Sequence, residues 1–230
     1  MHTDPQIFCA IDTPEIEKAC ALAREIGPVT KGIKLGLEFF NAYGPSGIEK
    51  VQESCPEAAL FVDLKYHDIP NTVAGAVRAL TSNLEPAYLN VHAAGGRPMM
   101  EAALDAMQGR SKLLAVTVLT ALSEEDIKAV GYGYSMKEQV LRMARLTKDA
   151  GLAGIVCSSH EIEMIRSDLG SDFTLMVPGI RPHGTALGDQ KRVMGPKDAL
   201  DIGATHLVIG RPITGADDPA KAAQDILESL

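Results

Sequence analysis

Three features are missing from this sequence, and each absence excludes a class of protein. No run rich in lysine and arginine occurs and the formal net charge is -8, which argues against nucleic acid or an acidic membrane as the main partner. No apolar run approaches the roughly 18 residues that span a membrane, and residues 1–5 do not form a basic segment followed by an apolar one. We therefore expect a cytoplasmic protein with neither a membrane span nor a signal peptide.

Cysteine is scarce and carries no motif. The four residues, Cys9, Cys20, Cys55 and Cys157, include no C-x-x-C pair and have no histidine at metal-site spacing. Disulfide frameworks and zinc sites depend on such patterns. We therefore predict neither, and interpret the four thiols as small hydrophobic side chains.

The chain does contain a repeating order of segments and enough apolar residues, 46% of 230, for a large core. A strand-like run followed by a helix-like run occurs eight times. The expected strands are residues 6–11, 32–35, 59–65, 88–91, 112–119, 152–157, 173–177 and 206–209. The expected helices are residues 13–26, 47–54, 72–80, 98–107, 136–150, 159–169 and 196–202, a short extra one from 123, and a last one capped by Asp218 and Pro219.

Alternating strands and helices predict a parallel sheet. Eight such units in this length favour a (β/α)₈ barrel, the TIM barrel, over an open doubly wound sheet. No linker divides the chain, so we predict an α/β fold with one barrel domain over residues 1–230. At the first helix we expect Thr13 and Pro14 to form the start, and Gly27 and Pro28 to form the end.

The third expected strand ends in a cluster of charges. Asp63 and Lys65 follow the apolar run 59–62, and Asp68 comes shortly after. Side chains alternate along a strand, so Asp63 and Lys65 share the face of Phe61. A half-buried carboxylate and ammonium are costly unless they are paired, so this strand needs either a structural ion pair or a chemical use. The pattern alone leaves both possibilities open.

In a barrel of this kind the active site lies at the carboxyl ends of the strands. Many polar residues of this sequence lie at or just beyond the expected strand ends: Asp12, Lys34, Asp63, Lys65, His92, Thr120, Arg181 and Arg211. This placement favours a functional interpretation of the charge cluster. We interpret His92, and likewise His67, as hydrogen-bonded structural residues.

The loops after the seventh and eighth strands both carry a glycine and an arginine. Gly179 and Arg181 follow the seventh strand, and Gly210 and Arg211 follow the eighth. Glycine lets the backbone approach an anion, and arginine offers a fork of donors. Barrels often bind phosphate with these two loops, so we predict a phosphate site here.

Five separated motifs together resemble the orotidine 5'-phosphate decarboxylase family, nearly end to end. They are Lys34, the string Asp63-x-Lys65-x-x-Asp68-Ile69-x-x-Thr72, residues 91–96 (VHAAGG), residues 178–181 (PGIR) and residues 210–213 (GRPI). The resemblance implies a cofactor-free and metal-free enzyme. Its reaction would convert orotidine 5'-monophosphate to UMP and CO₂, the last step of de novo pyrimidine (UMP) biosynthesis.

The chemistry of that reaction suits the residue types present. Loss of CO₂ from C6 leaves a carbanion with no ordinary electron sink, so catalysis needs a fixed positive charge and a proton beside C6. Lys65 can supply both. The resemblance implies that Lys65 is the proton donor, that Asp63 lies near the substrate carboxylate, and that Lys34 and Asp68 complete an alternating charge array. Asp68 would come from the partner subunit of a homodimer with a shared active site.

The resemblance also implies the substrate-binding residues. Asp12 and Lys34 would contact the ribose hydroxyls, and Thr72 the phosphoribosyl end across the dimer interface. Thr120 would contact the pyrimidine edge. The phosphate side would comprise Gln190, which bridges base and phosphate, Gly210, Arg211 and Arg181, with residues 182–192 as a loop that closes over the ligand.

Two alternatives stay open at this point. A related barrel that acts on a sugar phosphate shares the Asp-x-Lys-x-x-Asp pattern but uses magnesium, and Lys34 speaks against it because an ammonium repels a metal ion. A catalytically silent phosphate-binding barrel is the second, since a fold does not determine function. The complete set of four charged residues, Lys34, Asp63, Lys65 and Asp68, argues against that alternative.

Overall fold

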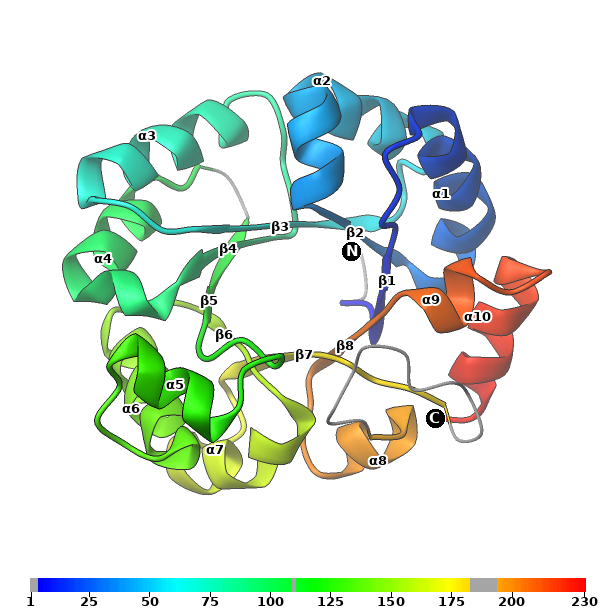
Figure 1. Cartoon of the computed structure of the whole chain (residues 1–230). Coiled ribbons are helices and arrows are strands. Elements are labelled where there is room, and N and C mark those ends of the chain that lie inside the picture. The colour runs from blue at the N-terminus through cyan, green and yellow to red at the C-terminus, as the bar shows by residue number, and fades with distance from the viewer. Residues whose placement is uncertain (1–3, 109–110, 183–193) are drawn as a thin grey trace.

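The computed structural model describes residues 4–108, 111–182 and 194–230. Within these residues, eight strands pair in parallel and in chain order, and β1 pairs with β8 to close the barrel (Figure 1). The predicted (β/α)₈ barrel is therefore confirmed. The strands are β1 (Ile7–Ala10), β2 (Gly32–Gly36), β3 (Ala59–Tyr66), β4 (Tyr88–His92), β5 (Lys112–Val116), β6 (Gly154–Val156), β7 (Thr174–Pro178) and β8 (His206–Ile209).

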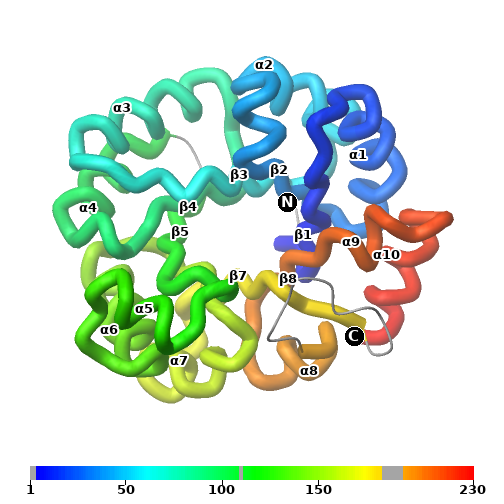
Figure 2. Tube along the Cα trace, in the orientation of Figure 1, coloured from blue at the N-terminus to red at the C-terminus, as the bar shows by residue number. Residues whose placement is uncertain are grey.

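Helices follow the strands and form an outer ring around the barrel, as the trace in Figure 2 shows. They are α1 (Ile16–Thr30), α2 (Leu37–Ser54), α3 (Pro70–Thr81), α4 (Gly96–Ala106), α5 (Glu124–Val130), α6 (Met136–Asp149), α7 (Ile162–Leu169), α8 (Pro196–Asp201), α9 (Arg211–Thr214) and α10 (Pro219–Glu228). No helix in the described ranges combines the length and the apolar character that a membrane crossing needs.

The core has two layers. The larger one lies between the strands and the helices, and a smaller one fills the barrel interior. In the interior, Phe8 packs edge-on against Phe61 and Tyr88, with ring centroids 6.0 and 5.5 Å apart. Strands covered on both faces bury consecutive side chains, which explains why β1 reads as an unbroken apolar run. The four cysteines are buried, in keeping with their interpretation as small hydrophobic side chains.

A polar network joins buried Tyr88 and His206 to exposed Asp4 and Lys112 at the amino-terminal end of the barrel. The Tyr88 hydroxyl lies 2.8 Å from His206 Nε2 and 3.1 Å from Asp4 Oδ2. His206 Nδ1 lies 2.7 Å from the Pro5 carbonyl oxygen, and Lys112 Nζ donates to Asp4 Oδ2 at 2.7 Å. Burial lowers the pKa of His206, so the imidazole is neutral at pH 7.

The first helix differs from the prediction at both ends. Glu15 is its N-cap, and Thr13 Oγ1 instead accepts a hydrogen bond from the Glu15 N–H at 3.3 Å. Pro28 lies inside the helix, which continues to Thr30. The ring of a proline clashes with the Cβ of the preceding residue in a helix, but Gly27 has no Cβ. The Gly-Pro pair therefore does not end this helix.

Helix α2 starts earlier than predicted, at Leu37 instead of residue 47. It contains a break at Gly44, whose φ of 61° and ψ of -160° are not helical, directly before Pro45. Glycine and proline are typical helix breakers, so this pair led the sequence analysis to miss the first half of the helix. The short helix α9 was not predicted, and β5 and β6 are shorter than expected.

We predict that Tyr88→Phe lowers the free energy of unfolding by about 1 to 3 kcal/mol, because His206 loses a buried hydrogen-bond partner. Denaturant unfolding at a fixed protein concentration measures the change. Tyr134→Phe is the control: Tyr134 is 40% exposed and its ring stacks on Arg142, so we expect a change within about 0.5 kcal/mol. Equal stability of the two variants would contradict the role given to the network.

Candidate active site

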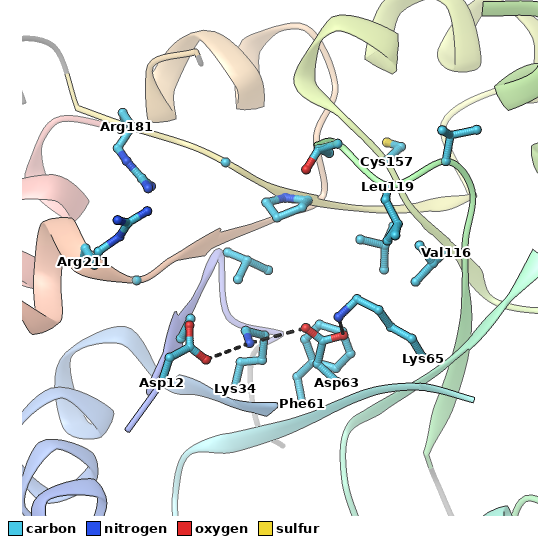
Figure 3. A pocket seen from close by; sticks show the side chains of 18 residues that line it. Asp12, Lys34, Phe61, Asp63, Lys65, Val116, Leu119, Cys157, Arg181 and Arg211 are labelled. Carbon is cyan, nitrogen blue, oxygen red and sulfur yellow. Dashed lines mark hydrogen bonds and ion pairs between the residues drawn. The ribbon is translucent and has the colours of Figure 1, made fainter. Parts of the chain in front are cut away.

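A pocket of about 310 Å³ opens at the carboxyl ends of the strands (Figure 3). Its floor carries apolar side chains such as Phe61, Val116 and Val208. Nine site residues expected from the sequence line it: Asp12, Lys34, Asp63, Lys65, Thr120, Gly179, Arg181, Gly210 and Arg211. They come from six strand ends, so only barrel closure brings them together.

The backbone of β3 is irregular where it carries the charges. Its pairing with β4 runs from Val62 opposite Leu89 to Tyr66 opposite Val91, with a shift of register between them. Lys65 has a φ of 50°, in the left-handed region that side chains seldom adopt. A bulge re-aims the side chains of a strand. Here the Asp63 and Lys65 side chains both point into the pocket.

Four side chains form a row of alternating charge across the pocket. Lys34 Nζ lies 3.4 Å from Asp12 Oδ1 and 3.3 Å from Asp63 Oδ2. Lys65 Nζ lies 2.6 Å from Asp63 Oδ1. Each ammonium thus has a carboxylate beside it, and Asp63 lies between the two lysines.

This row determines which side chains are ionised. Burial alone would raise the pKa of Asp63, but Lys34 and Lys65 outweigh it and hold that pKa below its ordinary value. Burial alone would lower the pKa of Lys34, but the carboxylates of Asp63 and Asp12 raise it above its ordinary value. At neutral pH Lys34 and Asp63 are therefore both charged.

Asn90 of β4 is a site residue that sequence reasoning missed. Its Nδ2 donates to Asp63 Oδ1 at 2.7 Å, and its Oδ1 accepts from the Lys65 backbone N–H at 2.7 Å. The available signal was an amide within the otherwise apolar run of residues 88–91. A buried polar side chain in such a run needs a partner, and charged residues lie on the neighbouring strand.

Two arginines lie on the side of the pocket away from Lys65. Arg181 follows β7 and Arg211 follows β8, and their guanidinium groups point toward one another in Figure 3. Burial and then the charge of Arg211 lower the pKa of Arg181. Gly179 has a φ of 78°, which favours glycine. An anion between the two cations would relieve their repulsion.

The family model described as "Orotidine 5'-phosphate decarboxylase / HUMPS family" matches residues 5–226. This chain belongs to that family. A curated relative from Rhodospirillum rubrum, named orotidine 5'-phosphate decarboxylase, is 50% identical, and the match covers 96% of this chain and 92% of the relative. A relative of the same name from Photobacterium profundum is 45% identical over 99% of both chains.

Solved structures agree with this membership. The crystal structure of orotidine 5'-phosphate decarboxylase from Lactobacillus acidophilus matches with a TM-score of 0.86 at 33% identity, and the match covers 98% of both chains. A Pyrococcus horikoshii structure at 23% identity, with a TM-score of 0.80, supports the fold alone. The resemblance inferred from the five motifs is therefore confirmed at the level of the family.

Three residues that the family resemblance implicates lie away from this pocket or outside the described ranges. Asp68 and Thr72 are exposed on the segment that joins β3 to α3 and on α3 itself, and Ile69 between them is 65% exposed. Asp68 Oδ1 accepts a hydrogen bond from the Ile69 N–H at 2.6 Å. Gln190 lies outside the described residues, as does nearly all of the expected loop 182–192.

The two histidines named from the sequence, His67 and His92, contact neighbouring protein groups. The rings of His67 and His92 stack with centroids 5.3 Å apart, and His92 Nδ1 accepts from the Ala94 N–H. Within the described ranges, no three histidine, cysteine, aspartate or glutamate side chains gather in a way that would hold a metal ion. The carboxylates of Asp12 and Asp63 flank one cation, and that cation is the Lys34 ammonium.

We predict that Lys34→Met raises the pKa of Asp63, because the neighbouring charge with the largest effect disappears while burial remains. In the wild type, the stability from ionised Asp63 is present above its unfolded pKa of about 3.9, and it is lost as pH falls through the lower folded value. The variant should lose about 3 kcal/mol of stability at pH 7, since a buried charge loses a partner.

Carboxyl-carbon NMR of Asp63 and pH-dependent unfolding measure these two effects. Lys50→Met is the matched control, because Lys50 is exposed and pairs with exposed Glu17. We expect this control to leave the Asp63 titration where it is in the wild type. An unchanged Asp63 pKa in Lys34→Met would show that the row does not govern its ionisation.

Proposed function

We propose that this protein decarboxylates orotidine 5'-monophosphate to UMP and CO₂, the last step of UMP biosynthesis. The observation that carries the proposal is the pairing, in one pocket, of the alternating charge row with two converging arginines. Relatives at 44–50% identity carry the name of this enzyme. We further propose that residues 1–230 act as one catalytic domain, in keeping with a barrel closed by the first and last strands.

In the proposed reaction, the bond between C6 and the carboxylate carbon breaks, CO₂ leaves, and the electron pair stays on C6. The Lys65 ammonium stabilises this carbanion electrostatically and then transfers a proton from Nζ to C6. The resulting amine takes up a proton from water. Asp63, beside the substrate carboxylate, pairs with the Lys65 ammonium at 2.6 Å and so holds it in position.

The remaining pocket residues would bind the nucleotide. Arg181 and Arg211, with Gly210, would hold the phosphate, and Thr120 would contact the pyrimidine edge. Asp12 and Lys34, which already pair with each other, would contact the ribose hydroxyls. Gln190 would bridge base and phosphate. Binding energy from the distant phosphate can then support the chemistry at C6.

The protein would require neither a metal nor an organic cofactor. Lys34 supports this part of the proposal, because its ammonium lies between the two carboxylates that a magnesium ion would need. In a magnesium-dependent sugar-phosphate enzyme, that position would be expected to carry a metal ligand. The silent-barrel alternative lacks a comparable reason for the largely buried charges of Lys34 and Asp63, which are costly to maintain.

A homodimer would complete the site. Asp68 and Thr72 are exposed and lie beside Ile69, a large apolar side chain that is 65% exposed. In the proposed dimer, the partner subunit would cover this side chain. In the proposed dimer, Asp68 extends the partner's charge row and Thr72 contacts the partner's nucleotide.

We predict rapid loss of the orotidine 5'-monophosphate ultraviolet absorbance on addition of the purified protein, with equal rates in chelator and in added magnesium. Lys65→Ala should lower kcat by roughly 10⁴-fold or more, since it removes both the charge and the proton. Its affinity for UMP should remain appreciable. Activity only with magnesium would favour a sugar-phosphate enzyme, and tight nucleotide binding without turnover in the wild type would favour the silent barrel.

We also predict that two inactive variants restore activity when mixed. Lys65→Ala and Asp68→Ala damage different contributions to each site, so a mixed dimer has one intact site. At equal amounts and full exchange, about a quarter of wild-type activity should return. Subunit exchange is verified with differently tagged chains, and mixing two samples of Lys65→Ala is the control. No recovery despite verified exchange would refute the shared site.

A further inference from the structure

Asn90 is a fully buried amide in the middle of β4, between Leu89 and Val91. Both ends of its side chain are bonded to the charged segment of β3. Nδ2 donates to Asp63 Oδ1, and Oδ1 accepts from the Lys65 backbone N–H, each at 2.7 Å. The carboxylate can only accept and the backbone N–H can only donate, so this amide has one possible orientation.

The position of Asn90 coincides with the irregularity of β3. In the pairing of the two strands, residues 63 to 65 lie opposite the single residue Asn90. Lys65 there adopts a φ of 50°. Such a conformation persists only where the surroundings hold it. The Asn90 side-chain oxygen stabilises this conformation, because Oδ1 accepts a hydrogen bond from the Lys65 backbone N–H.

Asn90 also restrains the Asp63 carboxylate. Asp63 Oδ1 accepts from both Asn90 and Lys65, and Oδ2 lies 3.3 Å from Lys34 Nζ. Three donors from three strands therefore prevent the carboxylate from turning. A neutral donor adds no charge to the row, so it orients Asp63 without competing with either lysine for it.

We propose that Asn90 is a positioning residue for the decarboxylation. It does not line the pocket, and acts through its neighbours: one amide holds both the Asp63 carboxylate and the Lys65 backbone, and so determines where Lys65 Nζ lies relative to C6. Small displacements of a reacting group cost large factors in rate. The inference rests on the proposed function, but the hydrogen bonds themselves are testable without it.

Two substitutions separate the two hydrogen bonds. Asn90→Leu has a similar size and removes both. Asn90→Asp keeps an acceptor for the Lys65 N–H but replaces the donor to Asp63 with a second carboxylate. Two adjacent carboxylates share a proton, which raises one of their pKa values. The groups that face this pair are Lys34 from β2 and Lys65 from β3, and both stay in place.

We expect kcat to fall by about 10 to 100-fold in both variants, while the affinity for UMP changes by less than about threefold. In Asn90→Asp, the acid limb of the kcat profile should move to higher pH, because Asp63 must be ionised to act. Asn90→Leu should lower kcat without such a large shift of that limb. A role in stability alone would lower the folded fraction and leave the kcat of the folded enzyme unchanged.

Thr117→Val is the matched control. Thr117 is fully buried, lies just beyond β5, and donates a side-chain hydrogen bond only to the Val156 carbonyl oxygen. It should leave kcat within about twofold of the wild type. A similar fall of kcat in Thr117→Val and the Asn90 variants, or unchanged kcat in folded Asn90 variants, would overturn the inference.

A measurement on the unmodified protein covers the case in which the variants do not fold. The side-chain amide protons of Asn90 should exchange slowly with solvent, and their NMR shifts should follow the titration of Asp63. Fast exchange, or amide-proton shifts that do not change as Asp63 titrates, would refute the inference. Slow exchange and linked titration without any turnover of orotidine 5'-monophosphate would instead support the hydrogen bonds and refute the proposed function.

Discussion

The Asp63 carboxylate lies between two ammonium groups in a largely buried position, and the rest of the site depends on this arrangement. Its side chain is 14% exposed, and that of Lys34 is 9% exposed. A buried charge without a partner is strongly unfavourable, whereas the complete row is internally compensated. Asp12, Lys34, Asp63 and Lys65 therefore form one unit, and strands β1, β2 and β3 must end at matching depths for it to exist.

The barrel brings these strand ends to the same level, and its two ends are built differently. Aromatic rings fill the interior, and the network around Tyr88 and His206 lies at the amino-terminal end. The carboxyl end remains open, and there residues from seven strand ends surround one pocket. The charge row crosses this pocket from Asp12 to Lys65, and Lys65 lies on the side away from the two arginines. A ligand with a phosphate and a distant reacting carbon suits this separation.

Sequence reasoning succeeded where one local rule decided the structure. Eight apolar runs alternating with helical segments implied the barrel, and strand alternation placed Asp63 and Lys65 on one face. It failed where a neighbour outweighs a local rule. Pro28 did not end α1 because Gly27 lacks a Cβ, and the break at Gly44 concealed the first half of α2. The expected contributions of Asp68 and Thr72 depend on a second chain.

The sequence by itself determined the order of strands and helices, the charges available at the strand ends, and membership of a decarboxylase family. Only the tertiary structure decided how those charges pair and that Asn90 joins them. Asn90 lies 25 positions from Lys65 and 27 from Asp63 along the chain. No local pattern links residues so far apart. They meet because β3 and β4 pair side by side, with a bulge opposite Asn90 that the amide itself holds.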